Sequence, residues 1–554
     1  MRVKAESGEK DIMRAFFALC GALLPLLAVG APPADPCVKV AGKTFAAPTD
    51  VLACQKSFPF NETLRQNVLT NMERVFDFFT FEDYYLKSPP PFQESTVNIR
   101  ETLAKINNTH FKTDYDFNIA IYDFTTQLND GHTRWFPDCY TLYQNILPAP
   151  VVNIEVDGVQ GVFVAPDSVE FLSQLGDEFT SFFDDLGFDW KRLAGAKVVE
   201  IEGRDPYDYV DFIAKTVSGN YLDHGVRVNS VFSSYRVSGT NFSQRIGDLA
   251  GPTVVRQTSL HMKLIPVHSR AVESVDIPFL ANYLGLPFTD GPSFWAANCA
   301  ANDLTNGVDL KGFRVQDLPR KLAKAEIIDK SGGNGINLPP PFLPNTTSVP
   351  GSEGVIKSFI LPDNKTGVMF LGSFAGDFDR FQADVVAAIS AFQKAKVSQL
   401  LLDLTNNGGG FVCLGQFLHQ YLSGSQIGYP GFVSTNRANP LAQTIVAADI
   451  DLGLDARFTF YTADNCMAGN QVLEWTDLDT EIKTAGVKDD PHAPPDLLVS
   501  GNFRHNWRTA WSFFDENVPI AYESELPTFR FNYTAETYNK PQALWEFAAK
   551  QLFG

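Results

Sequence analysis

Two short segments carry residue types that could perform acyl-transfer chemistry. The first is Thr405 to Gly410 (TNNGGG), in which three consecutive glycines follow an apolar run. Because glycine has no Cβ, its backbone N–H groups can approach a ligand closely and stabilise an oxyanion. The sequence contains neither G-x-x-x-x-G-K-[ST] nor G-x-G-x-x-G, which disfavours a phosphate or dinucleotide site. A flexible turn without a function is the alternative interpretation.

The second segment is Asn129 to Thr133 (NDGHT), which contains His132. Histidine is the side chain most often used as a general base, and the carboxyl end of a helix favours its protonated form. A turn histidine with no catalytic role is the alternative. Cys413 is a nucleophile in principle, although a small core residue or a disulfide partner is the stronger interpretation. C-x-x-C and H-E-x-x-H are both absent, so we expect no metal site and no cofactor.

Helical periodicity precedes the histidine. Apolar residues recur at helical spacing between 64 and 79, and again between 117 and 128, where Asn129-Asp130-Gly131 ends the pattern. We therefore expect a helical N-terminal domain over 32–150. The apolar pieces 151–156, 161–164 and 197–201 are typical of strands and predict a small β module over 151–265. Residues 266–330 mix helical and strand patterns, and 331–352 are typical of a Gly/Pro-rich linker. We therefore expect 266–350 to be a mixed segment followed by a linker.

The glycine-rich segment follows a strand–helix–strand pattern. Residues 367–371 and 400–404 are apolar strands, and Phe381, Val385, Ile389 and Phe392 lie on one face of a helix between them. Such a βαβ unit has parallel strands. A further amphipathic helix ends the chain. The predicted fold class is therefore α/β, with the core domain over 351–554 preceded by a helical segment and a β module.

Composition excludes several classes of protein. The chain has 554 residues and a formal net charge of −19, which disfavours a nucleic-acid or anionic-membrane partner. With 44% hydrophobic residues it is too apolar to be disordered, and its length predicts several domains.

The N-terminus predicts export. Residues 15–29 form an apolar run of the length of a signal-peptide core, so we expect a signal peptide over 1–31, with translation starting at Met13. No later segment is apolar enough for a membrane anchor. The mature chain keeps six cysteines, of which Cys37 and Cys54 are the first expected disulfide, and the other pairings stay open. We expect a secreted or luminal glycoprotein whose N-x-S/T sites are Asn61, Asn107, Asn241, Asn345, Asn364 and Asn532.

Together, Asp130-Gly131-His132-Thr133 and Asp403 to Gly410 resemble the tail-specific (carboxyl-terminal-processing) serine peptidases. The most similar branch is the fungal secreted group related to chlamydial protease-like activity factor. The resemblance covers most of residues 37–554. It implies a divergent PDZ-like module around 193–206 and a crotonase-like protease core. It also implies that His132 is the general base and that amides near Gly409 and Gly410 form the oxyanion hole.

The resemblance further implies a nucleophilic serine on a later strand-to-helix turn, and the sequence contains no such segment. We therefore expect that this chain is truncated at its C-terminus relative to the family. A secreted serine endopeptidase is the first hypothesis. Some fungal members accompany pathways for ribosomal cyclic-peptide mycotoxins such as ustiloxins and phomopsins, so a repeat-containing precursor peptide is the candidate substrate. The alternatives are a peptide-binding pseudoprotease and an enzyme of other acyl chemistry. The sequence predicts no oligomeric state.

Overall fold

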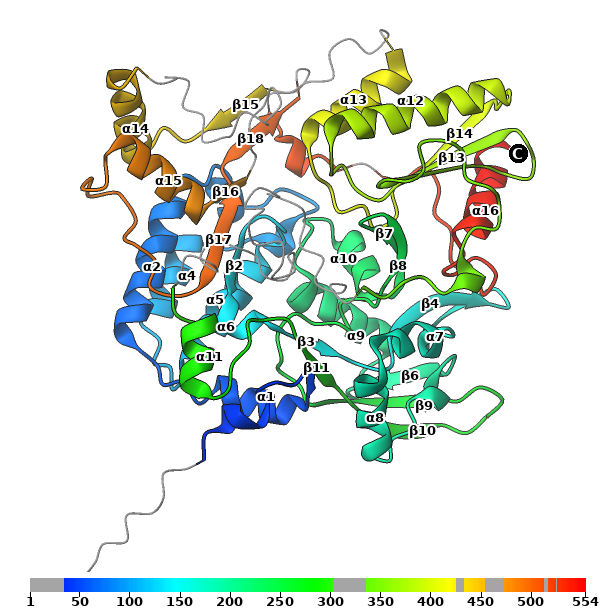
Figure 1. Cartoon of the computed structure of the whole chain (residues 1–554), viewed down its shortest axis with the longest axis horizontal. Helices are drawn as coiled ribbons and strands as arrows, with labels where there is room; N and C mark the ends of the chain where they lie inside the picture. Colours follow the sequence, from blue (N-terminus) through cyan, green and yellow to red (C-terminus); the bar gives the residue numbers. More distant parts are fainter. Residues whose placement is uncertain (1–33, 302–334, 425–432, 454–471, 513–516, 525) are drawn as a thin grey trace, which may run out of the picture. The chain divides into compact units, whose positions relative to one another are not determined.

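The computed structural model describes residues 34–301, 335–424, 433–453, 472–512, 517–524 and 526–554 (Figure 1). The predicted signal peptide over 1–31 lies outside these residues. The chain divides into two units, Met1–Asp35 and Pro36–Gly554, and the described helices and strands lie in the second.

Five helices open this unit and lead to the predicted histidine: α1 (Pro48–Gln55), α2 (Glu62–Phe76), α3 (Glu82–Leu86), α4 (Ile99–Asn107) and α5 (Asp114–Gln127). The side chains of Asn61 and Thr113 accept hydrogen bonds from the first-turn amides of α2 and α5, which explains where these helices begin. Both helices predicted from periodicity are therefore confirmed.

The apolar faces of α2, α3, α4 and α5 pack against elements from the distant C-terminal part of the chain. Those elements are α14 (Pro440–Asp451), β16 (Val472–Glu474), α15 (Trp475–Ala485) and β17 (Gly501–Asn506). Strand β17 lies between β16 and β2 (Arg134–Pro137), antiparallel to both. One hydrophobic cluster combines Met72 and Val75 of α2 with Ile445 of α14 and Leu478 of α15. Residues from the predicted helical and core domains therefore share one core.

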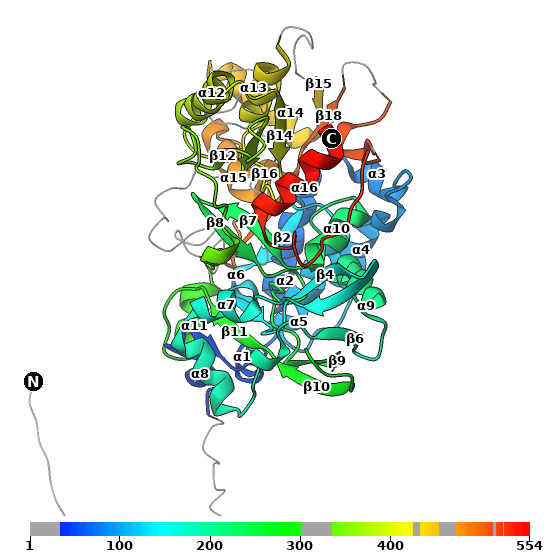
Figure 2. The same ribbon diagram turned by 90° about the vertical axis from the view of Figure 1, so that its right-hand side faces the viewer.

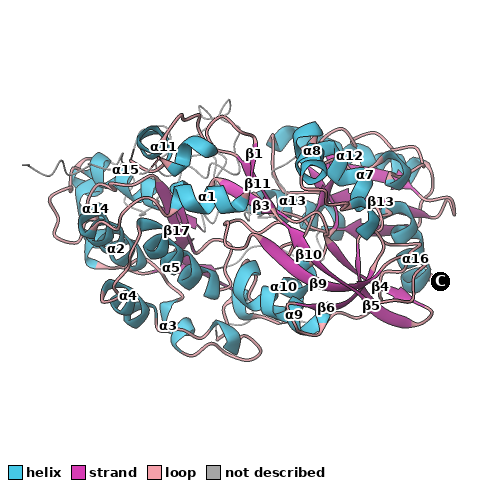
Figure 3. Ribbon diagram, turned by 90° about the horizontal axis from the view of Figure 1, so that it is seen from below, coloured by secondary structure: helices cyan, strands magenta, loops and turns pink. Residues whose placement is uncertain are grey.

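A five-stranded antiparallel sheet follows, in the order β10-β9-β6-β5-β4 (Figure 3). Its strands are β4 (Val151–Val156), β5 (Val159–Val164), β6 (Lys197–Ile201), β9 (Ser259–Ile265) and β10 (Glu273–Pro278). The first three were predicted, and β10 comes after residue 265. The associated helices are α7 (Ser168–Leu172), α8 (Asp177–Asp185), α9 (Pro206–Ile213) and α10 (His224–Val231), and residues from all four lie in one core with the sheet.

Smaller elements connect these parts. Strands β1 (Phe45–Ala46), β11 (Leu280–Tyr283) and β3 (Tyr143–Ile146) form one sheet, and β7 (Ser234–Ser238) pairs with β8 (Asn241–Arg245). Strand β15 (Val433–Asn436) pairs with β18 (Arg508–Trp511). Helices α6 (Asp138–Thr141) and α11 (Gly291–Asn298) flank the disulfide between Cys139 and Cys299. A second disulfide joins Cys37 to Cys54.

The predicted βαβ unit is present. Strands β13 (Thr366–Leu371) and β14 (Gln399–Asp403) are parallel and are joined by α12 (Phe378–Lys394), while β12 (Ile356–Ile360) pairs antiparallel with β13. Successive residues of β13 point to opposite faces. Met369 and Leu371 pack against α12 and α13 (Val412–Ser423), whereas Val368 and Phe370 pack against β7 and α16 (Pro541–Phe553). Figures 1 and 2 show these helices around β13 and β14.

The described part of the chain therefore mixes helices with small sheets, which agrees with the predicted α/β class. Among the described residues, no helix has the length and apolar character needed to cross a membrane.

Candidate functional site

His132 lies on a tight turn between α5 and β2. The turn is built by Asp130, whose Oδ1 accepts a hydrogen bond from the backbone N of His132 (2.9 Å) and whose Oδ2 accepts one from Thr133 Oγ1 (2.6 Å). Asn129 adopts a positive φ of 53°, which the short polar side chain of asparagine tolerates. The His132 side chain is half-buried. The turn thus holds the backbone of the candidate base while its side chain stays partly accessible.

Residues from two distant segments hold this turn. Asn506, the last residue of β17, donates from Nδ2 to Asp130 Oδ2 (2.7 Å), and Arg504 donates from Nη2 to the carbonyl oxygen of Gly131 (3.0 Å). The backbone N of Gly131 donates to the carbonyl oxygen of Asn220 (3.1 Å), in the loop before α10. Sequence reasoning missed all three, because no local pattern links residues so far apart in the chain.

The glycine-rich loop leaves the carboxyl end of β14 and leads into α13. Its first anchor is Asp403, a buried carboxylate that accepts hydrogen bonds from Tyr235 Oη (2.9 Å), Trp545 Nε1 (2.6 Å) and the backbone N of Thr405 (2.8 Å). Asn406 donates from Nδ2 to the carbonyl oxygen of Tyr235 (2.7 Å). The loop is therefore anchored to β7 and α16 and is not a free turn.

Glycine is required at position 410. Its φ is 136°, and a Cβ there would lie 2.1 Å from the carbonyl oxygen of Phe374. That oxygen accepts from the backbone N of Phe411 (2.7 Å), and the backbone N of Phe374 donates to the carbonyl oxygen of Gly409 (2.7 Å). The loop is thus paired with the segment at Phe374 through backbone hydrogen bonds alone, and a side chain at position 410 would separate them.

The two predicted oxyanion-hole amides differ in availability. The backbone N of Gly409 donates to Asn407 Oδ1 (2.8 Å), so this N–H is already used within the loop. The Gly410 backbone is exposed, and none of the described residues accepts a hydrogen bond from its N–H. Of the pair, Gly410 is the amide that can donate to a ligand.

The histidine turn and the glycine loop are attached to one segment, residues 219–238. Its start contacts the histidine turn through Asn220, and its end contacts the glycine loop through Tyr235. Between them lies α10, eight residues long, which spans about 12 Å. Within the described residues no hydrogen bond joins His132 directly to the loop.

The remaining cysteine candidate is not a free thiol. Cys413 is disulfide-bonded, which confirms a disulfide partner, one of the two favoured interpretations, and excludes a nucleophilic thiol. Among the described residues, no group of three or more His, Cys, Asp or Glu side chains could hold a metal ion. Five of the predicted glycosylation sites, Asn61, Asn241, Asn345, Asn364 and Asn532, are exposed, and Asn107 is half-buried. Glycosylation stays a prediction.

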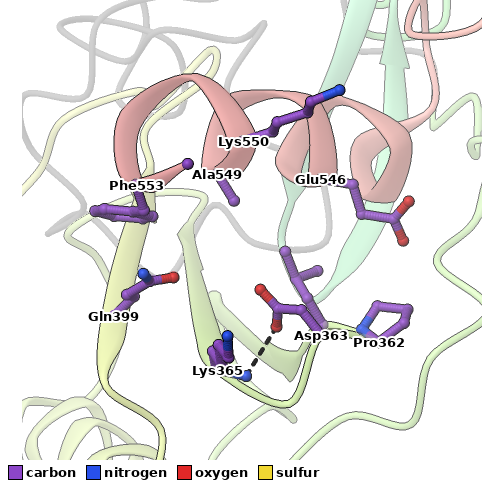
Figure 4. A pocket seen from close by; sticks show the side chains of 10 residues that line it. Pro362, Asp363, Lys365, Gln399, Glu546, Ala549, Lys550 and Phe553 are labelled. Atoms are coloured by element: carbon purple, nitrogen blue, oxygen red, sulfur yellow. Dashed lines mark hydrogen bonds between the residues drawn. The ribbon is translucent and has the colours of Figure 1, made fainter.

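A cavity of about 420 Å³ opens between α16 and the turn that joins β12 to β13 (Figure 4). Asp363 and Lys365 of that turn, Gln399 of β14, and Glu546 and Lys550 of α16 line it. Gln399 begins β14, whereas the glycine loop follows its last residue, roughly 13 Å along the strand. The cavity is therefore at the opposite end of the sheet and is separate from the candidate site.

Buried titratable groups lie near the site but outside it. Burial lowers the pKa of His505, on β17, to about 4, although its Nε2 lies 2.8 Å from the carbonyl oxygen of Val75. Burial also raises the pKa of Asp114, on α5, to about 6, against the opposing effect of hydrogen bonds from Tyr140 and Asn118. His505 is therefore neutral between about pH 4 and 6.5, where a histidine in water is charged. Asp114 is neutral between pH 3.8 and about 6, where an aspartate in water is charged.

Comparisons with known proteins show what the chain resembles. No family model matches the chain. The chain is 23% identical over 360 residues to the Peptidase S41 family protein phomP1' of Diaporthe leptostromiformis, which is 60% of this chain and 48% of that protein. The chain thus spans about half the length of the curated relative it matches.

Among solved structures, the chain matches a photosystem II D1 C-terminal processing protease at 13% identity over 64% of each chain. The TM-score of 0.21 is too low to establish a shared fold. The similarity in sequence confirms the resemblance to the tail-specific peptidases, and it relates this chain to the S41 peptidases.

Proposed function

We propose that the protein is a serine-type peptidase that hydrolyses peptide bonds, with His132 as general base and Gly410 as an oxyanion-hole donor. The observation that supports this most directly is the attachment of the histidine turn, through Gly131, and of the glycine loop, through Asn406, to the two ends of segment 219–238. A base and an oxyanion donor must stay in a constant relation to one scissile carbonyl, and a shared support provides this.

In this proposal each residue has a separate task. A serine hydroxyl attacks the carbonyl carbon while the His132 imidazole accepts its proton, and the Gly410 N–H donates to the oxygen that becomes negative. His132 then returns the proton to the leaving amine, and water releases the acyl group by the same steps. Gly409 acts by shape, because its N–H is bound to Asn407. The serine itself is not identified.

The domain roles are part of the proposal. Residues 351–554 would supply a crotonase-like core, which the parallel pair β13–β14 with its crossover helix α12 supports. Residues 151–265 would supply a PDZ-like module, which the antiparallel sheet and its packed helices support. A repeat-containing precursor peptide is the proposed substrate, and the secretory route is the proposed compartment because the chain contains disulfides.

A peptide-binding pseudoprotease is the second candidate function. It is favoured by the burial of Ser500, the serine directly before β17, because this serine is not available as a nucleophile. Its side chain is buried and donates from Oγ to Asp138 Oδ2 (2.6 Å), so this serine has a structural role. Such a protein would bind peptides through the β module without cleaving them.

Hydrolysis of a fluorogenic peptide library by the secreted protein distinguishes the two functions. The peptidase proposal expects turnover that His132→Ala reduces by about 10³-fold or more. His268→Asn is the matched control, since His268 is an exposed turn histidine with a positive φ of 65° and should retain full activity. Peptide binding without turnover by the wild-type protein would favour the pseudoprotease.

A further inference from the structure

Two arginines lie side by side beneath the histidine turn. Arg134 of β2 and Arg504 of β17 are directly opposite each other in the antiparallel register. Opposed residues of such a pair project from the same face, with Cβ atoms about 5 Å apart. Both side chains are buried, at 1% and 3% exposure. Two like charges thus share one buried site.

The Arg134 guanidinium has no hydrogen-bond partner within the described part of the chain. Its Nε, Nη1 and Nη2 are all buried, and none of them reaches a described acceptor or forms an ion pair with a described carboxylate. Its guanidinium lies over the ring of Tyr122, with Cζ 5.6 Å from the ring centre. A ring face attracts the cation but does not accept five N–H bonds.

Arg504 is only partly bonded. Its Nη2 donates to the carbonyl oxygen of Gly131, and its Nη1 lies 4.0 Å from Glu474 Oε1. Its buried Nε reaches no described acceptor. Arg134 and Arg504 therefore place several N–H donors without described acceptors in the same buried region.

The nearby carboxylates do not hydrogen-bond to Arg134. Asp130 and Asp248 both attract Arg134 electrostatically. Asp130 already accepts hydrogen bonds from His132, Thr133 and Asn506. Asp248 Oδ1 accepts from Arg245 Nη2 (2.8 Å), and its buried Oδ2 accepts from none of the described residues. Their attraction acts across a gap that no direct hydrogen bond bridges.

A buried arginine elsewhere in the chain shows the contrast. Arg227 is as buried as Arg134, yet it donates to the carbonyl oxygens of Ala214, Tyr221 and Leu222 and to Glu94 Oε2 (2.5 Å). Buried cations in folded proteins are paired in this way, because desolvation without a partner is costly. Arg134 departs from the pattern, and a missing acceptor explains the departure.

We propose that Arg134 and Arg504 bind a small monovalent anion, and that the ligand is chloride. An anion at this position accepts the unused N–H groups and offsets the repulsion between the two guanidinium groups. The wall beside Arg134 restricts its size, since a Cβ on Gly219 would lie 2.9 Å from Arg134 Nη1 and 2.6 Å from the carbonyl oxygen of Thr126. A divalent anion would lose far more hydration energy on entering such a site.

The melting temperature of the whole protein in sodium chloride and in sodium gluconate, at equal ionic strength, tests the proposal. We expect chloride to raise the melting temperature in a saturating manner, because a ligand that binds only the folded state stabilises it. Arg134→Met removes the charge at similar length and should abolish the difference. Arg256→Met is the matched control and should retain it, since Arg256 pairs with Asp123 and is partly exposed. Equal melting temperatures in the two salts would overturn the proposal and indicate that water binds the unused N–H groups. A chloride effect that persists in Arg134→Met would also overturn it, because chloride would then bind elsewhere.

A second measurement does not depend on the variant folding. Crystals of the wild-type protein grown in bromide should show an anomalous peak in contact with the guanidinium groups of Arg134 and Arg504. A difference map without a peak at this position would contradict the proposal.

Discussion

Asn506 donates a hydrogen bond from Nδ2 to Oδ2 of Asp130 at 2.7 Å, so the end of β17 holds the turn that carries His132. The two residues are 376 positions apart in the chain. The candidate base is therefore positioned by a strand that folds back from the C-terminal part, and this relationship leads to the first prediction.

Asn506→Ala should loosen the histidine turn. It removes one of the side-chain donors to Asp130 in a partly buried site, which we expect to lower the free energy of unfolding by about 1–2 kcal/mol. Hydrogen exchange at residues 130–133 should accelerate. Asn229→Ala, at an exposed position outside the predicted glycosylation sites, is the control and should change neither quantity. Unchanged exchange in Asn506→Ala would show that the turn does not depend on β17.

Gly410→Ala should disrupt the glycine loop. A Cβ there conflicts with the Phe374 carbonyl oxygen, and the φ of 136° is unfavourable for alanine, so we expect a loss of at least about 1–3 kcal/mol. Gly408→Ala is the matched control, because no atom lies within 4 Å of its added Cβ. Urea unfolding compares the two variants, and equal stability would contradict the loop geometry.

His505 should make the fold less stable in acid. Its pKa in the folded protein is about 4, below the ordinary value of 6.5, so its contribution is complete above pH 6.5. As the pH falls from 6.5 to 4 the unfolded chain binds a proton that the folded chain does not, which costs about 3 kcal/mol in total. Asp114 and Asp167, whose pKa values burial raises to about 6, act in the opposite direction between pH 6 and 3.8.

Because Asp114 and Asp167 act in the opposite direction, the effect of His505 is measured as the difference in unfolding free energy between His505→Phe and wild type. We expect the stability of His505→Phe relative to wild type, from urea unfolding, to rise by about 3 kcal/mol between pH 7 and pH 4. A constant difference across this range would contradict the neutral buried state of His505.

The donors to Asp403 should control the order of the glycine loop. Trp545→Phe and Tyr235→Phe each remove one hydrogen bond to this buried carboxylate while keeping an aromatic ring, and each should cost about 1–3 kcal/mol. Because both act on the same oxygen, the double variant should deviate from additivity. Hydrogen exchange at residues 404–411 reports how well the loop is ordered and should be faster in each variant. Additive losses of stability without faster exchange would show that the hydrogen bonds to Asp403 do not order the loop.

The elements that sequence predicted are those with a local signal. Helices α2 and α5 show their apolar spacing and their caps within a few residues, and β13, α12 and β14 are contiguous in the chain. Strand β17 could not be predicted, because Arg504 and His505 are polar residues whose burial depends on distant partners. The same reason applies to the site: His132 and Gly410 lie in recognisable segments, whereas Asn220, Arg504 and Asn506 acquire their roles only through contacts with residues far away in the chain.

Labelling with a fluorophosphonate probe, followed by mass-spectrometric mapping of the modified peptide, tests the central claim most directly. We expect the wild-type protein to be labelled on one serine, His132→Ala to abolish the labelling, and His268→Asn to be labelled like wild type. Labelling that survives in His132→Ala would contradict the assignment of His132 as the base, and a folded wild-type protein without labelling would contradict the peptidase itself.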